Sequence, residues 1–166
     1  MTHHSYNGRD GYSEDSLLPL SGIQHIAFCE RQWALIHIER LWLDNVRTVE
    51  GHLMHERAHD SSLYEDDGDH ITMRAVPLVS RRLGLFGQAD VVEFWPVEDG
   101  ARGGARLLGH QGLWLPKPIE YKRGKPKSDD RDQVQLCAQA MCLEEMLGAE
   151  ITTADLYYGQ PRRRQR

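Results

Sequence analysis

Two short stretches of the sequence carry side chains whose types and spacing could do chemistry, one at Asp90 and the other at the triplet Glu120-Tyr121-Lys122. Both stretches are rich in β-branched and aromatic residues, so we expect each to form a strand. Successive side chains of a strand point to opposite faces, which places Glu120 and Lys122 on one face and Tyr121 on the other. If Asp90 lies on the adjacent strand, two carboxylates and one ammonium group meet in a small volume.

Such a group of side chains favours a divalent metal ion. Two carboxylates at close range repel each other unless a cation lies between them. Carboxylate oxygens suit Mg²⁺ or Mn²⁺, which keep further positions for water or a substrate phosphate. Lys122 then lies where it could orient an attacking water or help to deprotonate it, so the pattern indicates metal-assisted hydrolysis of a phosphodiester. The alternative is an exposed salt bridge between Glu120 and Lys122, worth less than about 1 kcal/mol.

The composition describes one domain with an uneven distribution of charge. A chain of 166 residues is long enough for one hydrophobic core. Its net charge of −5 argues against a generally basic nucleic-acid-binding surface. Basic residues nevertheless cluster around the candidate site and at the end of the chain: Lys117, Lys122, Arg123, Lys125, Lys127 and Arg131, then Arg162, Arg163, Arg164 and Arg166. A local patch of this kind can bind phosphates, and a solvated loop followed by an arginine tail is the alternative interpretation.

The sequence predicts a cytoplasmic protein with no membrane contact. No run of about 18 apolar residues is present, and the N-terminal segment is polar, so we expect neither a membrane span nor a signal peptide. The three cysteines have irregular spacing and do not form a disulfide framework, which favours a reducing compartment.

The N-terminal part predicts a polar segment followed by two helices. Residues 1–16 are rich in His, Gly, Asp and Ser and are expected to be disordered. Ser21 and Gln24 have the spacing of a capping box, which predicts a helix from there to about Arg40. A second helix is expected over residues 46–58.

The remainder predicts strands, one long helix and a short tail. Strands are expected over 71–79 and 85–95 with a turn near Gly84, then a long loop over 96–116 that contains five glycines, then the Glu120 strand. A helix follows Asp129 and Asp130 and ends at Gly148, and a last strand covers 152–158. This order predicts an α/β domain over 17–160, a mixed central sheet flanked by helices, with a basic tail at 161–166.

The segment His55-Glu56-Arg57-Ala58-His59 matches the HExxH pattern of zinc peptidases, in which two histidines one helical turn apart bind zinc. The extended form of that pattern requires Gly and His where this chain has Ser62 and Glu65. His55 could instead join Asp90 and Glu120, and such a mixed nitrogen and oxygen site favours Mn²⁺. A zinc peptidase remains an alternative at this point.

The cysteines do not form a metal site by spacing. Cys29 lies in the first expected helix. Cys137 and Cys142 are five residues apart, about 140° around a helix, so they do not face one metal ion together. Both are predicted to be buried apolar residues.

Five sets of residues occur in the same order as in one known family. They are Leu20-Ser-Gly-Ile-Gln-His25 with Phe28-Cys-Glu-Arg-Gln-Trp33, Glu50-Gly-His-Leu-Met-His55-Glu-Arg-Ala-His59, Gly87-Gln-Ala-Asp90, Glu120-Tyr-Lys-Arg-Gly-Lys125-Pro126, and Gln135-Leu-Cys-Ala-Gln-Ala-Met-Cys-Leu-Glu-Glu145. From residue 18 to 159 the chain closely resembles the CRISPR-associated RecB-like exonuclease, the fourth Cas protein family of the PD-(D/E)xK nuclease superfamily. The resemblance implies a restriction-endonuclease-like fold.

The resemblance also implies roles for single residues. His55, Asp90 and Glu120 would be the metal ligands, with the Tyr121 carbonyl completing the shell, and Lys122 would be the catalytic lysine. Gln135 matches the first position of a helical Q-h-x-x-Y motif that orients the substrate and the active site. Gln139 stands at the position of the tyrosine.

An iron–sulfur cluster is a further implied cofactor. Members of the family bind it through four cysteines, one early and three near the C-terminus. Cys29 matches the first, and no cysteine of this sequence matches the other three. We therefore expect the chain to be a fragment of a longer or fused protein.

The function implied by the resemblance is a metal-dependent deoxyribonuclease that trims prespacer DNA, single-stranded or with overhanging ends, before its integration into a CRISPR array. The expected partners are the CRISPR integrase and its small dimeric companion. One alternative is a subunit of the adaptation complex that binds single-stranded DNA with little cleavage of its own.

Overall fold

A seven-stranded mixed sheet forms the centre of the computed structural model, which describes residues 6–7, 11–41, 64–98 and 103–166. The strand order is β4-β5-β6-β7-β8-β9, with β3 beside β6. These strands are β3 (Leu18–Pro19), β4 (Glu65–Asp66), β5 (Ile71–Ser80), β6 (Leu85–Val97), β7 (Leu113–Lys122), β8 (Asp155–Tyr158) and β9 (Arg163–Gln165). Only the β7–β8 and β3–β6 pairs are parallel.

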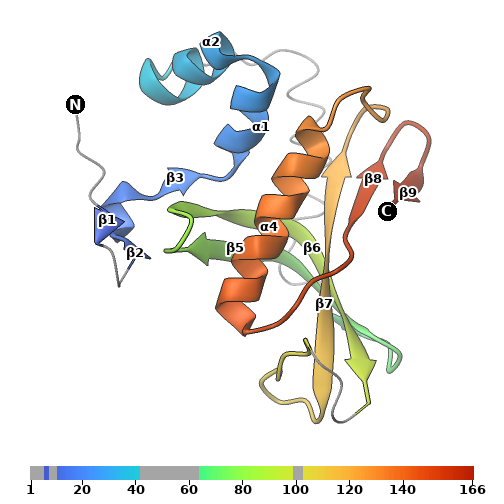
Figure 1. The fold of residues 1–166 in the computed structure, drawn as a ribbon. Helices are drawn as coiled ribbons and strands as arrows, with labels where there is room; N and C mark the ends of the chain where they lie inside the picture. Colours follow the sequence, from blue (N-terminus) through green and yellow to red (C-terminus); the bar gives the residue numbers. More distant parts are fainter. Residues whose placement is uncertain (1–5, 8–10, 42–63, 99–102) are drawn as a thin grey trace.

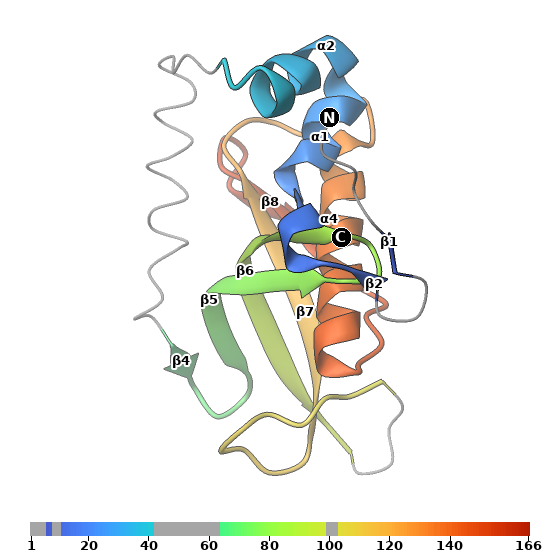
Figure 2. The ribbon, with the colours of Figure 1, turned by 90° about the vertical axis from the view of Figure 1, so that its left-hand side faces the viewer.

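The helices lie against this curled sheet. Helix α4 (Arg131–Leu147) packs on one face of the sheet against β5, β6, β7 and β8, and α1 (Ser21–Phe28) and α2 (Glu30–Trp33) lie beyond the N-terminal end of α4 (Figures 1 and 2). Helix α2 continues into η2 (Ala34–Ile38), a short stretch of wider helical turns. The predicted α/β arrangement with a mixed sheet is therefore confirmed. Among the described residues, no helix is both long and apolar enough to cross a membrane.

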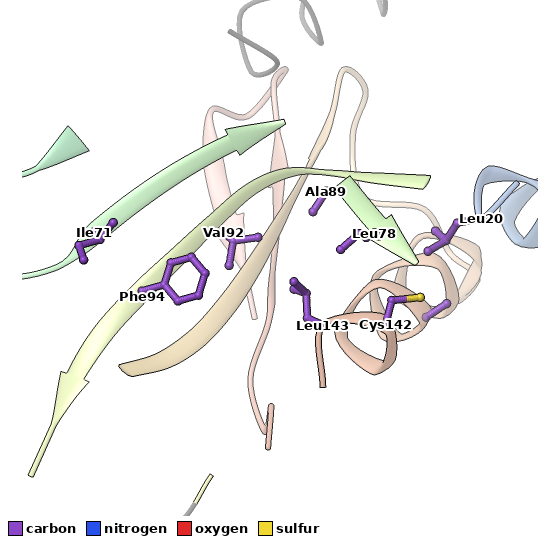
Figure 3. Close-up of a cluster of buried hydrophobic side chains, with 9 residues drawn as sticks. Leu20, Ile71, Leu78, Ala89, Val92, Phe94, Cys142 and Leu143 are labelled. Atoms are coloured by element: carbon purple, nitrogen blue, oxygen red, sulfur yellow. The ribbon is translucent and has the colours of Figure 1, made fainter. Parts of the chain in front are cut away.

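The hydrophobic core lies between α4 and the sheet (Figure 3). Cys142 and Leu143 of α4 belong to the same buried cluster as Val92 and Phe94 of β6, and all four are at most 2% exposed. The buried positions of α4 follow a helical period: Asp132, Gln135, Leu136, Ala138, Gln139, Cys142 and Leu143. Three of these seven are polar, which is unusual for a core-facing stripe and marks the part of the helix nearest the candidate site.

The strands and the long helix were predicted closely. Strands β5 and β6 pair antiparallel around a turn that ends at Gly84, whose φ of 69° lies in the region that favours glycine. Asp130 precedes the first residue of α4, and Gly148 ends the helix in the left-handed conformation. Strand β8 begins at Asp155, three residues later than expected.

The prediction of one continuous helix from Ser21 to about Arg40 is wrong. Cys29 is extended, with φ −166° and ψ 118°, and it separates α1 from α2. The capping box is also absent, because Leu20 occupies the N-cap position and makes no side-chain cap hydrogen bond. Gln24 instead donates to Asp132 of α4. A tertiary contact thus takes the side chain that local sequence assigned to a cap.

The long loop after β6 is shorter than predicted, because β7 begins at Leu113. Leu113 to Pro116, predicted as the end of that glycine-rich loop, instead pair with β6, with Pro116 opposite Phe94. Strand β8 pairs only with residues from Ile119 onward, so the first part of β7 is an edge among the described strands. Proline is tolerated at an edge, where its missing N–H leaves no ladder bond unmade.

Both ends of the described chain are more ordered than predicted. Within the segment expected to be disordered, β2 (Gly11–Tyr12) pairs with β1 (Tyr6–Asn7), and η1 (Glu14–Ser16) follows. The Tyr12 N–H donates to the Arg81 carbonyl at 2.8 Å, which ties this segment to the sheet. The predicted basic tail contains β9, which pairs antiparallel with β8. The predicted second helix at 46–58 lies outside the described residues.

Candidate active site

Asp90 and Glu120 come from adjacent antiparallel strands, the condition on which the interpretation of a metal site depended. Val91 of β6 lies opposite Ile119 of β7, so the next positions along the two strands bring Asp90 and Glu120 together. Both side chains are buried, each residue being 2% exposed. The backbone N–H of Tyr121 donates to Asp90 Oδ2 at 2.8 Å and fixes that carboxylate. A buried carboxylate pair thus forms at the centre of the sheet.

Lys122 reaches back over this pair from the end of β7. Its Nζ donates to Glu120 Oε1 at 2.8 Å and to Gln135 Oε1 at 2.8 Å. The lysine side chain is 13% exposed and that of Glu120 is 3% exposed, so this ion pair lies inside the protein. The interpretation of Glu120 and Lys122 as an exposed surface salt bridge is therefore wrong.

Two glutamines of α4 hold the Glu120 carboxylate from the helix side. Gln135 Nε2 donates to Glu120 Oε1 at 2.9 Å, and Gln139 Nε2 donates to Oε2 at 2.7 Å. The two side chains are one turn apart on the buried face of the helix, so each oxygen of Glu120 receives one amide. The sequence resemblance indicated Gln135 but not Gln139. A second glutamine four residues on, at a position of the apolar stripe, is the signal that could have identified it.

The environment of Glu120 favours its protonated form. Burial is the main cause that raises the pKa of this carboxyl, and the nearby Asp90 carboxylate raises it further. Lys122 and the amide of Gln139 act in the opposite direction. The net direction is upward even with Lys122 in place, so keeping Glu120 ionised beside Asp90 costs free energy when no metal ion is bound.

This pKa shift predicts how stability depends on pH in metal-free buffer. The folded protein holds the Glu120 proton more tightly than the unfolded chain, whose carboxyl has the ordinary value of 4.5. Tighter binding of this proton by the folded state adds to the free energy of unfolding. The added stability is complete below pH 4.5 and is lost as the pH rises through the raised pKa. Relative to Glu120→Gln, the wild-type protein is therefore expected to lose stability above pH 4.5. Urea unfolding of both proteins at a series of pH values measures the difference, and a gap that does not change with pH contradicts the shift.

The donor set fits a hard divalent cation in part. Asp90 and Glu120 offer buried carboxylate oxygens; burial raises the pKa of Glu120, the Asp90 charge raises it further, and a divalent cation between the two would offset both effects. Among the described ranges, no cluster of three or more acidic, histidine or cysteine side chains is placed to hold a metal ion. The expected third ligand, His55, lies in 42–63, outside the described residues, as does the whole HExxH segment.

A third buried carboxylate, Asp132, joins three segments next to this site. Lys127 Nζ lies 2.8 Å and Gln24 Nε2 2.5 Å from its Oδ1, and the Tyr158 hydroxyl donates to Oδ2 at 3.3 Å. Asp132 is fully buried at the start of α4, one turn before Gln135. Asp132 therefore ties the N-terminal part of α4, which also carries the two glutamines, to three segments. These are α1, β8 and the loop after Lys122.

We expect Asp132→Ala to lower the free energy of unfolding by roughly 3 kcal/mol, since three donors lose one charged acceptor that is fully buried. Chemical denaturation measures the change. Asp130→Ala is the matched control two residues earlier, because Asp130 is exposed and makes no side-chain cap bond. The control is expected to lie within about 0.5 kcal/mol of wild type. Equal effects of the two substitutions would contradict this role for Asp132.

The predicted basic patch is partly neutralised by ion pairs. Lys117 Nζ lies 2.5 Å from Asp155, and Lys127 pairs with Asp132. Arg131 pairs with Asp129 and also lies over the Phe28 ring, 4.4 Å from its centroid. Lys125 is exposed in the same loop. The local field near the site is therefore smaller than the count of lysines and arginines indicated.

The arginine-rich end is anchored on the sheet. Arg164 of β9 lies 2.7 Å from Glu93 and 4.0 Å from Asp155, two carboxylates that are each 4% exposed. Buried carboxylates require a cationic partner, which Arg164 supplies to Glu93 and Lys117 supplies to Asp155. Nothing in the arginine run itself distinguished this residue from its neighbours.

The cysteines lie apart from the carboxylate pair. Cys142 is buried, as predicted, and burial raises the pKa of its thiol to about 11. The prediction of a buried Cys137 is wrong, because Cys137 is exposed on the side of α4 away from Cys142. Cys29 is exposed at the break between α1 and α2.

Comparison with known proteins gives two relatives with the same kind of name. The chain is 29% identical over 140 residues to a "CRISPR-associated exonuclease Cas4/endonuclease Cas1 fusion" of Geobacter sulfurreducens. It is 26% identical over 144 residues to a protein of the same name from Leptospira interrogans. The matches cover 78% and 82% of this chain but only 22% and 23% of those proteins. No family model matches the chain.

These relatives confirm the resemblance that the motifs indicated: the chain is similar in sequence to Cas4-type CRISPR-associated exonucleases. It spans less than a quarter of the length of the curated relatives that it matches.

Proposed function

We propose that this chain is the nuclease part of a CRISPR adaptation system, a metal-dependent deoxyribonuclease of the PD-(D/E)xK type that trims prespacer DNA. The observation that carries the proposal is the buried group of Asp90, Glu120, Lys122 and Gln135, built from two adjacent strands and one helix. The exonuclease names of the two relatives support it independently. A purely structural ion pair does not account for a second carboxylate that raises the pKa of the first.

In this proposal the carboxylates of Asp90 and Glu120, with His55 and the Tyr121 carbonyl, hold Mg²⁺ or Mn²⁺. A bound divalent ion would polarise the phosphodiester and stabilise the charge that develops on it. Lys122 is then 2.8 Å from a ligand oxygen, where its ammonium group orients the attacking water and stabilises negative charge on the phosphate. Gln135 holds the lysine in place, and Gln139 fixes the orientation of Glu120.

The substrate proposed is DNA with a single-stranded end, and the partner is the CRISPR integrase with its small dimeric companion. Both relatives are named as fusions to the endonuclease Cas1, which supports a close association with such an enzyme. An iron–sulfur cluster would use Cys29, which is exposed where the helix breaks. Its other ligands are not present among the cysteines of this sequence.

A cleavage assay tests the proposal directly. Labelled DNA that is single-stranded, overhanging or blunt is incubated with the protein in Mn²⁺, Mg²⁺ or EDTA. We expect cleavage of the first two substrates with either metal and none in EDTA. Retention of DNA without cleavage in both metals would instead favour the DNA-binding subunit.

The two histidines of the HExxH segment separate the nuclease from the zinc peptidase. His55→Ala is expected to weaken Mn²⁺ binding and to lower DNA cleavage by about tenfold or more, because one ligand is lost. His59→Ala is the matched control and is expected to cut DNA at the wild-type rate. Calorimetry with Mn²⁺ and the cleavage assay measure both variants. Equal losses from the two substitutions, with zinc retained through purification, would favour the peptidase.

A further inference from the structure

Two adjoining hollows connect the catalytic group to the N-terminal helices. The inner hollow is lined by Gln135, Gln88, Ser21 and Phe86 among others, and the outer hollow by Phe86, Trp33, His37 and Arg40 among others. Pro19 and Phe86 line both, so the two form one groove, which we call the Phe86 groove. Gln135 is the residue that bonds both Lys122 and Glu120, so the groove begins beside the proposed reaction site.

Three of the described residues that line the outer hollow carry aromatic rings, Phe86, Trp33 and His37. Phe86 is 46% exposed although it lies on a central strand, where β3 passes beside it. Trp33 and His37 lie one turn apart, with ring centroids 5.7 Å apart and an angle of 31° between the planes. His37 is held by His25, whose Nδ1 lies 3.0 Å from His37 Nε2. An exposed aromatic ring in the same hollow as this pair of rings provides flat surfaces on which a planar group can stack.

The charge of the groove is suited to an anionic ligand. The chain carries 25 acidic against 20 basic residues, yet none of the described residues that line either hollow is acidic. Arg40 stands at the outer end and Lys122 lies beyond Gln135 at the inner end. Arg40 also has a φ of 55°, a conformation that favours glycine, and this backbone turn ends the helical segment where it lines the groove.

We propose that the Phe86 groove is a nucleotide subsite in which a base of the DNA strand stacks on Phe86 while Arg40 binds a backbone phosphate further along. This inference rests on the proposed nuclease function and adds to it the path that the strand takes away from the reacting phosphate. The outer hollow has a volume of about 610 Å³, within the range of sites that hold a ligand of nucleotide size. Stacking on an aromatic side chain tolerates any base, so the subsite selects unstacked bases and not a sequence.

Binding in EDTA tests the subsite without cleavage. The probes are two fluorescent strands of twelve units, one of thymidine nucleotides and one with the same backbone and no bases. Phe86→Leu keeps apolar bulk on the strand but removes the ring, and it is expected to weaken binding of the thymidine strand by about tenfold. Phe86→Tyr keeps the ring and is expected to bind as the wild type does. The strand without bases is expected to bind weakly and equally to all three proteins.

Arg40→Gln gives a second, independent measurement. Loss of one phosphate contact is expected to make binding less dependent on salt. For both strands, the slope of log K against log salt concentration is expected to fall by about the amount that one phosphate contact contributes. Leu108→Ala is the control, since Leu108 is fully exposed and lines neither hollow. Wild-type affinity of Phe86→Leu for the thymidine strand, or equal affinity of the wild-type protein for both strands, would overturn the subsite.

These outcomes are distinct from failure of the nuclease proposal. That proposal fails if the wild-type protein cuts no DNA in Mn²⁺ or Mg²⁺, whatever binding in EDTA shows. The subsite fails if cleavage is normal but binding does not depend on the ring of Phe86. Binding of neither strand by the wild-type protein also overturns the subsite.

Discussion

Lys122→Ala is expected to reduce DNA cleavage by about 10²–10⁴-fold, the usual contribution of a positioned group that helps to move a proton. The Lys122 ammonium group lies 2.8 Å from both Glu120 and Gln135. Among the described residues it is the only cation in direct contact with the Glu120 carboxylate, and the substitution removes it. The fold is expected to survive. Glu120 keeps two amide donors, and its already raised pKa allows it to take up a proton in place of the cation.

Lys125→Ala is the matched control, because Lys125 is exposed three residues further along the same loop. It is expected to cut DNA at nearly the wild-type rate. Single-turnover cleavage in Mn²⁺ measures the chemical step, and circular dichroism with thermal unfolding measures folding. Cleavage by Lys122→Ala at the wild-type rate would remove this lysine from the mechanism. A loss shared equally by Lys125→Ala would show that general charge, and not position, matters.

Asp90→Asn is expected to abolish both cleavage and stabilisation by Mn²⁺ while leaving the metal-free protein as stable as the wild type, or more so. The asparagine carbonyl can still accept the Tyr121 N–H, and one of the two facing negative charges is gone. With Mn²⁺ at about 100 times its dissociation constant, the wild type is expected to gain about 2.7 kcal/mol. For a chain of this length that gain corresponds to a rise in Tm of roughly 5–10 °C.

Asp155→Asn provides the comparison for this second substitution. Asp155 is an equally buried aspartate, 4% exposed, but it pairs with Lys117 instead of facing Glu120. This variant is expected to lose stability and still respond to Mn²⁺, whereas Asp90→Asn is expected to keep stability and lose the response. Thermal unfolding with and without Mn²⁺ gives both quantities. A normal rise in Tm for Asp90→Asn would contradict the assignment of Asp90 as a metal ligand.

Local patterns were sufficient for most regular elements and insufficient where distant segments compete for one side chain. The β-branched stretches predicted β5 and β6, and the acidic start and glycine end predicted α4. Gln24 was assigned to a helix cap but donates to Asp132, which is 108 residues away. A carboxylate that is fully buried offers more to a donor than a solvent-exposed cap does, so the tertiary contact prevails.

The sequence by itself determined which residues meet at the centre of the site. Strand alternation placed Glu120 and Lys122 together, and a hairpin of neighbouring strands brought Asp90 beside them. These are consequences of backbone geometry over short distances, so a pattern of residue types is enough. The order of the motifs was likewise enough to indicate the relatives that the comparisons found.

Only the tertiary structure decided how that centre is supported. Gln139 and Asp132 lie on the buried face of α4, yet their partners are Glu120, Gln24, Lys127 and Tyr158, and no local period of the sequence indicates such pairs. The same holds for Arg164, one arginine among several, which pairs with the buried carboxylate of Glu93. The reason is physical: burial of a charge requires a partner, and which partner is within reach depends on how strands and helices pack after they have formed.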